Sequence, residues 1–473
     1  MNFTLADVAA AAGAKVPAGA ADVDLSGVAV DSRAARPGVL FVALKGERAD
    51  GHDFAADAVF RGARAVLSQR IPSPLPEGCP VVAVPDPLAA MTALAVTLKD
   101  RAGFRLAAVT GSSGKTTTKE FTAAILSRRF TVERTPGNQN SAIGFPMSVV
   151  NLPRVPDWMV GEMGMSAKGE LSRLSRAFRP DVASITNVAP AHLASFNSID
   201  EVGEAKAEIL EGLRPSGTFV ANADDSRVAA IAGRWPGRVV RFGRLAKGAD
   251  VIADRFERGE AETRFRLRTS SDETAVVLPL PGTHQAVNFL AASAIALAAG
   301  ASLVDCAAAA PALSPSPHRG EFRRHASGAL LYDDSYNANP ASLRAALDTL
   351  ADFAATRRIA VLGDMRELGE DEDVWHRELG KYAAERVDRL ICVGELARWY
   401  GEGAVASGFA RAAIDSVDSP EEAAKLLEKN LREGDVVLIK GSRAVGLDRA
   451  VELLAVKSER GTRNAERGKA GEA

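Results

Sequence analysis

Cysteine is scarce in this sequence of 473 residues, and the three that occur, Cys79, Cys306 and Cys392, are far apart. Their separations do not match the spacing of metal ligands, and so few cysteines are typical of a reducing compartment. Residues 1–16 also lack the basic start and apolar core of a secretory signal. We therefore expect a cytoplasmic protein without a signal peptide.

An excess of charge of either sign is also missing. The 58 basic and 60 acidic residues leave a net charge of −2, which favours binding neither to nucleic acid nor to an anionic membrane. One uncharged stretch, residues 285–304, is long enough to span a bilayer, but polar residues interrupt it. We predict instead a buried helix that ends at Gly300, followed by a second short helix.

The standard phosphate-loop spacing, Gly-x-x-x-x-Gly-Lys, is absent, because it would need a glycine at Val109. The chain has a shorter pattern in which an apolar run, residues 106–109, predicts a buried strand and apolar residues after Lys115 recur at helical spacing. Residues 110–114 lie between the strand and the helix, and they predict a tight turn whose backbone only small residues can adopt. A chance glycine turn is the alternative, but strand, glycine loop and helix in this order predict a nucleotide site. Its residues are Gly111, Ser112, Ser113, Gly114, Lys115, Thr116 and Thr117.

In such a loop the backbone N–H groups and the positive end of the helix face the anion. Lys115 would reach the outer phosphates, and the Thr116 hydroxyl could hold Mg²⁺.

The length of the chain predicts two to four domains, because one hydrophobic core does not grow to this size. We predict an α/β fold with three: a small N-terminal α/β domain (1–84), a central P-loop-type domain with a parallel sheet (85–312) and a C-terminal Rossmann-like domain (313–456). Residues 457–473 are polar and predict a disordered tail. The segment 238–280 has alternating runs that predict an antiparallel excursion.

In the third domain the pattern predicts alternating strands and helices without a Gly-x-Gly-x-x-Gly fingerprint, so we expect no dinucleotide there. The predicted strands are Leu330–Asp333, Ile359–Leu362, Leu390–Val393 and Val436–Lys440. The predicted helices are Ser342–Phe353, Trp375–Ala384, Pro420–Asn430 and Ala444–Ala455.

Polar residues follow several predicted strands, where ligands bind in parallel sheets. Glu162 could be a Mg²⁺ ligand or an acid at a helix N-terminus. A lone histidine such as His192 is more often structural than a ligand. Lys206 lies among glutamates on a predicted helix, which favours an exposed salt-bridge face. Local sequence leaves these alternatives open.

Twelve motifs occur in an order and spacing that together resemble the Mur ligases, the ATP-dependent amide-forming enzymes of peptidoglycan precursor synthesis. They are DSR, ALKGERADGH, TGSSGKTTTKE, TPGNQNSAIGFP, EMGMS, TNVAPAHL, EAKAEI, NADD, GTHQAVN, DDSYNANPAS, LGDMRELGE and KGSR. The resemblance covers the chain to about residue 456. It departs at Ser141, Gln285 and Ala194, where the family usually has Asn, Asn and an acid.

The resemblance implies roles for residues in each domain. In the N-terminal domain, which would bind UDP-MurNAc-peptide, the uridine-diphosphate contacts would be Ser32, Arg33, Lys45, Gly51 and His52. In the central ATPase domain, the Mg²⁺ ligands would be Thr116, Glu162 and His192, the phosphate and substrate contacts Asn138, Asn140 and Asn187, and the nucleotide contacts His284 and Asn288. In the C-terminal domain, the residues that would close onto the nucleotide and the dipeptide are Arg319, Asp334, Asn337 and Asn339. Those that would contact the dipeptide or its carboxylate are Lys440, Ser442 and Arg443. Lys206 matches the lysine that Mur ligases carbamylate.

The motifs most resemble the family member that joins D-alanyl-D-alanine to UDP-MurNAc-tripeptide with ATP and two Mg²⁺ ions, and we expect a monomer. The catalytic residues would be Lys115, Asn138, His192 and Lys206. A sister ligase that adds diaminopimelate or lysine would be expected to show Asp-Asn-Pro-Arg, which is absent. A folylpolyglutamate-synthase-like ligase would share the ATPase domain, and a P-loop nucleotide switch would share the phosphate loop.

Overall fold

The computed structural model describes residues 1–455, so that the predicted disordered tail (457–473) lies outside the described residues. The chain forms two compact units. The first comprises Met1–Thr110, Arg129–Ser184 and Glu208–Phe219, and the second comprises Gly111–Arg128, Ile185–Ala207 and the described chain from Val220 onward.

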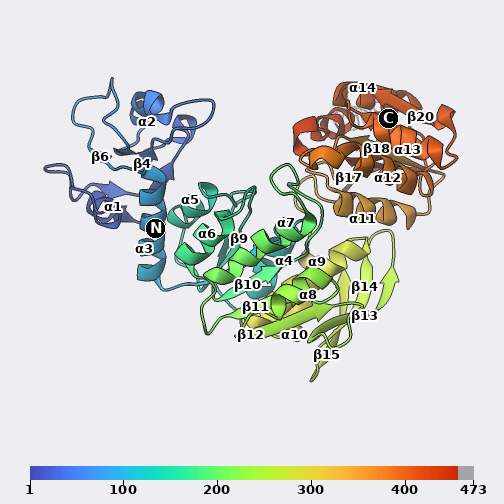
Figure 1. The fold of residues 1–473 in the computed structure, drawn as a ribbon, viewed down its shortest axis with the longest axis horizontal. Helices are drawn as coiled ribbons and strands as arrows, with labels where there is room; N and C mark the ends of the chain where they lie inside the picture. Colours follow the sequence, from blue (N-terminus) through green and yellow to red (C-terminus); the bar gives the residue numbers. More distant parts are fainter. Residues whose placement is uncertain (456–473) are drawn as a thin grey trace, which may run out of the picture. The chain divides into compact units, whose positions relative to one another are not determined.

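The first unit contains a small parallel sheet in the order β3-β4-β5-β6, formed by Gly27–Ala29, Val39–Val42, Ala65–Ser68 and Val81–Ala83. A two-stranded antiparallel ribbon, β1 (Phe3–Thr4) and β2 (Asp24–Leu25), precedes it. Thr4 and Asp7 form a capping box at the start of α1 (Leu5–Ala12). The helices α2 (Ala55–Phe60) and α3 (Pro87–Ala102) complete this part of the chain (Figure 1).

The largest sheet has nine strands in the order β15-β14-β13-β12-β11-β10-β7-β9-β8. Their bounds are β7 Arg105–Thr110, β8 Val132–Arg134, β9 Trp158–Glu162, β10 Val182–Ile185, β11 Thr218–Asn222, β12 Arg238–Gly243, β13 Val251–Arg258, β14 Thr263–Arg268 and β15 Glu273–Leu278. The predicted antiparallel excursion over 238–280 is wrong at its start, because β12 pairs with β13 in parallel. Only β13, β14 and β15 pair antiparallel there.

Helices connect these strands. They are α4 Lys115–Leu126, α5 Gly144–Val150, α6 Glu170–Phe178, α7 Ile199–Ala207, α8 Ser226–Ala232, α9 Thr283–Ala298 and α10 Leu303–Ala309. Helices α4 and α9 pack together through Phe121 and Phe289, whose ring centroids are 6.3 Å apart. The uncharged stretch 285–304 belongs to the buried helix α9 and to the start of α10, as predicted.

The third sheet lies within the second unit and has the order β16-β17-β21-β18-β19-β20. Its strands are β16 Glu321–Arg324, β17 Leu330–Asp333, β18 Arg357–Gly363, β19 Arg389–Val393, β20 Ile414–Val417 and β21 Asp435–Lys440. All neighbouring strands are parallel except β16, which pairs antiparallel with β17. The sequence did not predict β16 or β20, which lie at the two edges of this sheet.

Helices cover both faces of the third sheet (Figure 1). One hydrophobic core contains α11 (Pro340–Ala351), α12 (Glu372–Ala384) and α13 (Arg398–Ala406), and the other contains α14 (Pro420–Asn430) and the final helix. The predicted helix Ala444–Ala455 is wrong in its first turn. Residues 443–445 form a 3₁₀ turn that ends at Gly446 with φ 70°, and α-helix covers 448–455.

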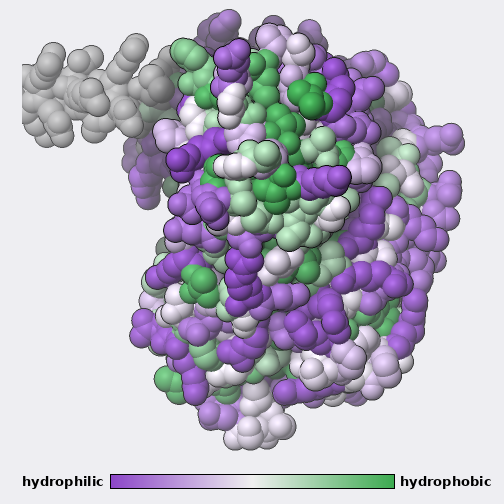
Figure 2. Space-filling model, turned by 90° about the vertical axis from the view of Figure 1, so that its left-hand side faces the viewer, coloured by the Kyte–Doolittle hydropathy of each residue, from purple (hydrophilic) through white to green (hydrophobic). Residues whose placement is uncertain are grey.

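The described surface is polar, with a few exposed hydrophobic side chains such as Phe54, Phe60 and Ile71. Figure 2 shows one face, on which hydrophilic residues surround smaller groups of hydrophobic ones. Within residues 1–455, no helix has both the length and the apolar composition needed to cross a membrane.

Candidate active site

The glycine loop between β7 and α4 adopts a conformation that requires its glycines. Gly111 has φ 147° and Gly114 has φ 76°. A Cβ atom on Gly111 would collide with the Thr186 hydroxyl, and one on Gly114 would collide with the Asn288 side chain. The N-cap residue of α4 is Gly114, which has no side chain with which to cap the helix. The loop therefore presents a helix start whose positive end is suited to a phosphate group.

Residues that follow β10 hold this loop in place. The Ser113 N–H donates to Asn187 Oδ1 (3.0 Å), and Asn187 Nδ2 donates to Ser113 Oγ (2.9 Å). The Thr186 hydroxyl donates to Ser113 O (2.6 Å), and the Ser112 hydroxyl donates to Ala189 O (2.9 Å). Asn187, predicted as a substrate contact, thus positions the loop in this structure. Sequence reasoning gave Thr186 and Ala189 no role, although both lie in the TNVAPAHL motif.

Lys115 and Lys206 lie near enough to each other for their charges to interact. Lys115 Nζ donates to Gly111 O over 2.9 Å. Lys206 is only 2% exposed. Its burial, and secondarily the positive charge of Lys115, hold the pKa of the Lys206 amine well below its usual value. The exposed salt-bridge face that local sequence favoured for Lys206 is therefore wrong.

Glu162 ends β9 in the first unit. Because β9 pairs in parallel with β7, Glu162 lies opposite Val109, two residues before Gly111 in the sequence. The carboxylate is buried and accepts a hydrogen bond from Asn140 Nδ2 over 2.7 Å. Asn138 lies in the exposed turn just before Asn140. The structure thus brings together two predicted site residues, Glu162 and Asn140, at the carboxyl edge of the sheet.

His192 and Thr116 belong to the second unit. Thr116 is buried in the first turn of α4. His192 has φ 58°, which is uncommon for a residue other than glycine, and its Nδ1 lies 2.6 Å from Glu367 Oε2. The hydrogen bond from His192 lowers the pKa of the Glu367 carboxyl. Sequence reasoning gave Glu367 no role, although it lies in the LGDMRELGE motif.

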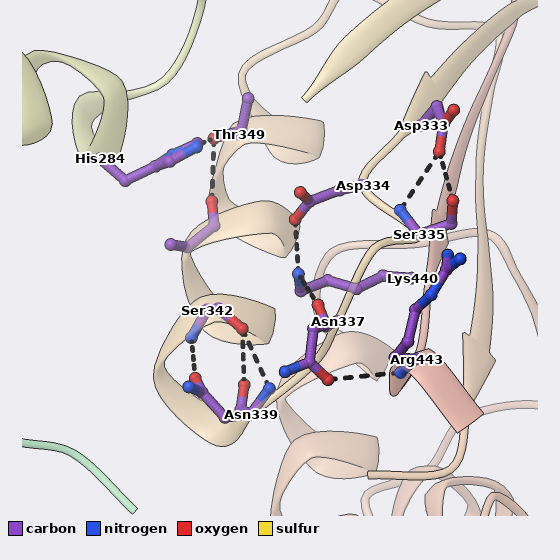
Figure 3. A network of polar contacts seen from close by, with 11 residues as sticks. His284, Asp333, Asp334, Ser335, Asn337, Asn339, Ser342, Thr349, Lys440 and Arg443 are labelled. Atoms are coloured by element: carbon purple, nitrogen blue, oxygen red, sulfur yellow. Dashed lines mark hydrogen bonds and ion pairs between the residues drawn. The ribbon is translucent and has the colours of Figure 1, made fainter. Parts of the chain in front are cut away.

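His284 and Asn288 share one face of α9, since they are four residues apart. Asn288 lies against Gly114, and His284 Nδ1 is 3.3 Å from the Thr349 hydroxyl (Figure 3). Gln285, where Asn is usual in the family, is buried, and its Oε1 has no hydrogen-bond partner within the described chain. The predicted nucleotide contact Asn288 therefore lies next to the phosphate loop.

Replacing His284 with glutamine should make the folded protein less sensitive to acid. Burial lowers the pKa of His284 to about 4, partly offset by Asp334. Between about pH 6.5 and pH 4 the unfolded chain binds a proton that the folded chain lacks, so stability falls as the pH falls. From pH 6.5 to 5 this group should remove about 1–2 kcal/mol, a loss that glutamine avoids. Melting curves at pH 7 and pH 5 test this; equal acid shifts in variant and wild type would contradict it.

The carboxyl ends of β17, β18 and β21 lie side by side at one edge of the third sheet. β21 lies between β17 and β18 but leads to a helix on the opposite face, which is the arrangement where ligands bind in open α/β sheets. Lys440 Nζ lies 2.5 Å from Asp334 Oδ2 and 2.9 Å from Asn337 O (Figure 3). Arg443 lies beside them, and its backbone N–H is 3.4 Å from Asn337 Oδ1.

Two further predicted site residues that follow these strands, Asn339 and Ser442, have partners in the protein. Asn339 caps α11 by accepting from Ser342 N–H over 2.9 Å (Figure 3). Its Nδ2 donates to Ser112 O over 3.3 Å. The Ser442 hydroxyl accepts from Arg366 N–H (2.8 Å), and Arg366 also pairs with the buried Asp364 (2.7 Å). Sequence reasoning gave Asp364 and Arg366 no role, although both lie in the LGDMRELGE motif.

The predicted uridine-diphosphate contacts lie at the carboxyl edge of the small sheet. Arg33 is 83% exposed and pairs with Asp31, while Ser32 is buried in the turn between β3 and β4. A Cβ on Gly51 would lie 2.6 Å from Leu44 O, so Gly51 permits the close approach of the loop. Lys45 forms a backbone bridge to Asp50 in the same loop.

His52 has protein partners at both ring nitrogens. Nδ1 lies 2.5 Å from Asp50 Oδ1, and Nε2 lies 3.2 Å from the backbone N–H of Gln69. In this structure His52 therefore ties the loop after β4 to the end of β5.

Three family models match the chain: Mur ligase family, catalytic domain (residues 24–97), Mur ligase middle domain (109–296) and Mur ligase, glutamate ligase domain (318–443). A relative from Mycobacterium bovis, named UDP-N-acetylmuramoyl-tripeptide–D-alanyl-D-alanine ligase, is 38% identical over 96% of this chain and 98% of its own. The crystal structure I of MurF from Acinetobacter baumannii has a TM-score of 0.87 at 31% identity and covers 96% of this chain and 99% of that chain. MurF from Thermotoga maritima in complex with ADP has a TM-score of 0.80 at 30% identity, covering 92% and 98%.

Proposed function

The chain belongs to the Mur ligase family, and we propose that it joins D-alanyl-D-alanine to the terminal carboxylate of UDP-N-acetylmuramoyl-tripeptide, with ATP as the energy source. The product is the pentapeptide precursor of peptidoglycan. The observation that carries this choice is the similarity over nearly the full length to ligases of that name. The phosphate loop alone would not distinguish the sister ligases.

In the reaction, the tripeptide carboxylate attacks the γ-phosphate of ATP and forms an acyl phosphate and ADP. The free amine of D-alanyl-D-alanine then attacks the acyl carbon, the amide bond forms and phosphate leaves. Phosphoryl transfer of this kind depends on positioning and charge stabilisation rather than on covalent chemistry by the protein. Lys115 at the start of α4 supplies a cation for the outer phosphates, and the glycine loop supplies backbone N–H groups.

The buried Glu162 carboxylate and the Thr116 hydroxyl are hard oxygen donors that fit Mg²⁺, and His192 is the third ligand of this proposal. Two bound Mg²⁺ ions would neutralise the phosphate oxygens. Thr116 comes directly after Lys115, and Glu162 ends the strand paired with β7. The chemistry of these donors and their places after neighbouring strands support the metal assignment.

We further infer that Lys206 carries a carbamate. Burial lowers the pKa of its amine and so increases the neutral fraction, which is the form that adds to carbon dioxide. The carbamate is an anion, so it would pair with Lys115 and the metal instead of repelling them.

Each of the three predicted domains would bind a different substrate. Residues 1–84 would bind the UDP-MurNAc moiety through Ser32, Arg33, Lys45 and the loop around Gly51 and His52. Residues 85–312 would bind ATP, and residues 313–456 would bind the dipeptide at the carboxyl ends of β17, β18 and β21. We propose a monomer that acts in the cytoplasm and binds no nucleic acid, in keeping with its small net charge.

Phosphate release from ATP should require both UDP-MurNAc-tripeptide and D-alanyl-D-alanine, because transfer needs the carboxylate and turnover needs the amine. Omitting either substrate should leave only background hydrolysis, and mass spectrometry should detect the ligated pentapeptide. A panel of tripeptides ending in diaminopimelate or lysine identifies the third residue. Equal phosphate release without the peptide substrates would favour a nucleotide switch, and ligation of a free diaminopimelate or lysine would favour a sister ligase.

A further inference from the structure

Lys99, in the last turn of α3, is a buried cation with few partners. Only 3% of its side chain is exposed. Among residues 1–455, its Nζ donates no hydrogen bond, and the only carboxylate within ion-pair distance is that of Asp100, at 3.9 Å on an exposed side chain. The Phe104 ring lies 5.9 Å from Nζ and attracts it weakly. A buried ammonium group is costly unless it is paired and hydrogen-bonded, so Lys99 lacks most of the partners that it needs.

The guanidinium group of Arg214 lies in the same part of the first unit and is also incompletely paired. Its Nε is buried and has no hydrogen-bond partner within the described chain, although Asp181 Oδ1 lies 3.3 Å away. The second oxygen of that carboxylate, Oδ2, accepts from the Leu106 N–H over 2.9 Å. Asp181 is therefore shared between a backbone donor and Arg214, and it is not a dedicated counter-ion for Lys99.

The charges around Lys99 are unbalanced towards the positive. Burial is the main reason why the pKa of the Lys99 amine is lowered, and the positive charge of Arg214 is the second. Asp100 and Asp181 each act on Lys99 more weakly than Arg214 does, and the exposed Arg179 adds to the repulsion. The negative end of α3 offsets part of this excess. Three cations thus meet two carboxylates, one of which is already engaged.

The starts of three neighbouring strands bring these cations together. Strands β11, β10 and β7 follow one another in the sheet. The Asp181 N–H donates to Leu106 O over 2.8 Å, and the Arg214 N–H donates to Pro180 O over 3.0 Å. These bonds hold the segments before the three strands side by side. Each cation lies in one of those segments: Lys99 before β7, Arg179 before β10 and Arg214 before β11.

This cluster is separate from the proposed nucleotide site. The glycine loop follows the carboxyl end of β7, whereas Lys99 lies before its amino end. A strand of 6 residues such as β7 spans roughly 20 Å, which is too far for one phosphate group to contact both ends. No residue of the cluster has a role in the ligase reaction proposed above.

We propose that Lys99, Arg179 and Arg214 form a binding site for a tetrahedral oxyanion of the phosphate class. Its oxygens would accept from Lys99 Nζ and from the guanidinium group of Arg214, which is 35% exposed, and Arg179 would cover the anion from the surface. Several N–H donors and three positive charges suit a ligand with several oxygens and more than one negative charge. The site does not depend on the ligase reaction.

The test compares the wild type with Lys99→Met, which keeps an unbranched side chain and removes its charge. Inorganic phosphate is titrated into each protein at constant ionic strength with saturating ADP, and the broadening of its ³¹P signal gives the dissociation constant. Phosphate that binds beside the nucleotide contributes equally in both proteins. We expect Lys99→Met to raise the dissociation constant of the additional site about tenfold or more, because a charge-assisted hydrogen bond is lost.

Arg179→Gln and Arg176→Gln form a matched pair at the end of α6. Arg179 is exposed and has no acidic partner among the described residues, so its glutamine variant should fold and should weaken phosphate binding about threefold. Arg176 already pairs with Glu211 at 2.8 Å, and its variant should bind phosphate as the wild type does. This pair keeps the test decisive if Lys99→Met does not fold.

Thermal unfolding gives a second measure of the same site. Phosphate at ten times its dissociation constant should raise the Tm of the wild type about 3–5 °C more than that of Lys99→Met, relative to chloride of equal ionic strength. Chloride at the same ionic strength removes the effect of general screening, so the difference reports the bound oxyanion.

Glycerol phosphate distinguishes the two sources of such an oxyanion. Affinity equal to that of inorganic phosphate would identify a site for the phosphate group of a larger molecule, and weaker binding would identify a site for the free ion. Equal phosphate affinity and equal Tm gain in the wild type and Lys99→Met would overturn the proposal. So would an Arg179→Gln variant that binds phosphate as tightly as Arg176→Gln. The peptide substrates play no part in these measurements, so failure of the ligase function would leave them unchanged.

Discussion

Replacing Lys115 with alanine should lower substrate-dependent phosphate release by about 10³-fold or more. Lys115 opens α4 directly after the glycine loop, and its ammonium group already lies against Gly111 O at 2.9 Å. Charge that develops on the transferring phosphoryl group would lose its nearest protein cation. A coupled assay for phosphate with all three substrates at saturation measures kcat, and ADP calorimetry measures how much ground-state binding is lost.

Lys425→Ala is the control for this change, since Lys425 is exposed on α14 and has no role in the proposal. It should retain wild-type turnover. Lys115→Arg keeps the charge but replaces a compact ammonium with a planar group, so it should recover only a small part of the activity. Near-normal turnover of Lys115→Ala would overturn the assignment of the loop.

The strand, loop and helix around Lys115 could be predicted because each signal is local. The apolar run, the small residues and the helical spacing predicted β7, the turn and α4 to within a residue or two. Strands at the edges of a sheet were harder to predict from the sequence. β16 and β20 are short and only partly buried, so their sequences lack the apolar run that marked the central strands. Whether β12 pairs parallel or antiparallel depends on its neighbour in the sheet, and the local sequence does not show which strand that neighbour is.

The roles within the site depend on partners that are remote in sequence. His52, Asn187 and Asn339 were predicted to contact ligands, and each has a partner in the protein, 17, 74 and 227 residues away respectively. Side-chain amides and imidazoles serve equally well for a ligand and for a backbone group, so their chemistry does not reveal which one they bind. Their ligand roles remain predictions, and the structure adds a positioning role to each.

Lys206 is the clearest case of a residue whose surroundings the local sequence does not reveal. Four glutamates within five residues on either side indicated a solvated helix face, yet the lysine is buried and next to another lysine. Only the packing of α7 determines which side of the helix faces inward. A buried amine beside Lys115 would be costly as a cation, so its presence calls for a chemical explanation.

Replacing Lys206 with alanine should lower turnover about 10²-fold or more, and added acetate or propionate should restore part of it. The variant leaves a space beside Lys115 in which a small carboxylate can replace the negative charge of a carbamate. In the wild type, the neutral amine adds to carbon dioxide and releases a proton. Activity should therefore fall after removal of carbon dioxide and return with bicarbonate, and ¹³C-bicarbonate should give a carbamate signal that Lys206→Ala lacks.

Lys99 is the matched control, because it is also buried and burial lowers the pKa of its amine, but it lies on α3 in the first unit. Lys99→Ala should keep the carbamate signal and show no response to acetate. The direction of the pKa shift also sets the pH dependence. A lowered amine pKa keeps the reactive neutral form present as the pH falls towards neutrality, whereas an ordinary lysine would be almost fully protonated there. Full activity of Lys206→Ala, or a wild type that does not respond to carbon dioxide and gives no ¹³C signal, would contradict the carbamate. The negative group proposed to face Lys115 and the metal would then have to come from the substrate.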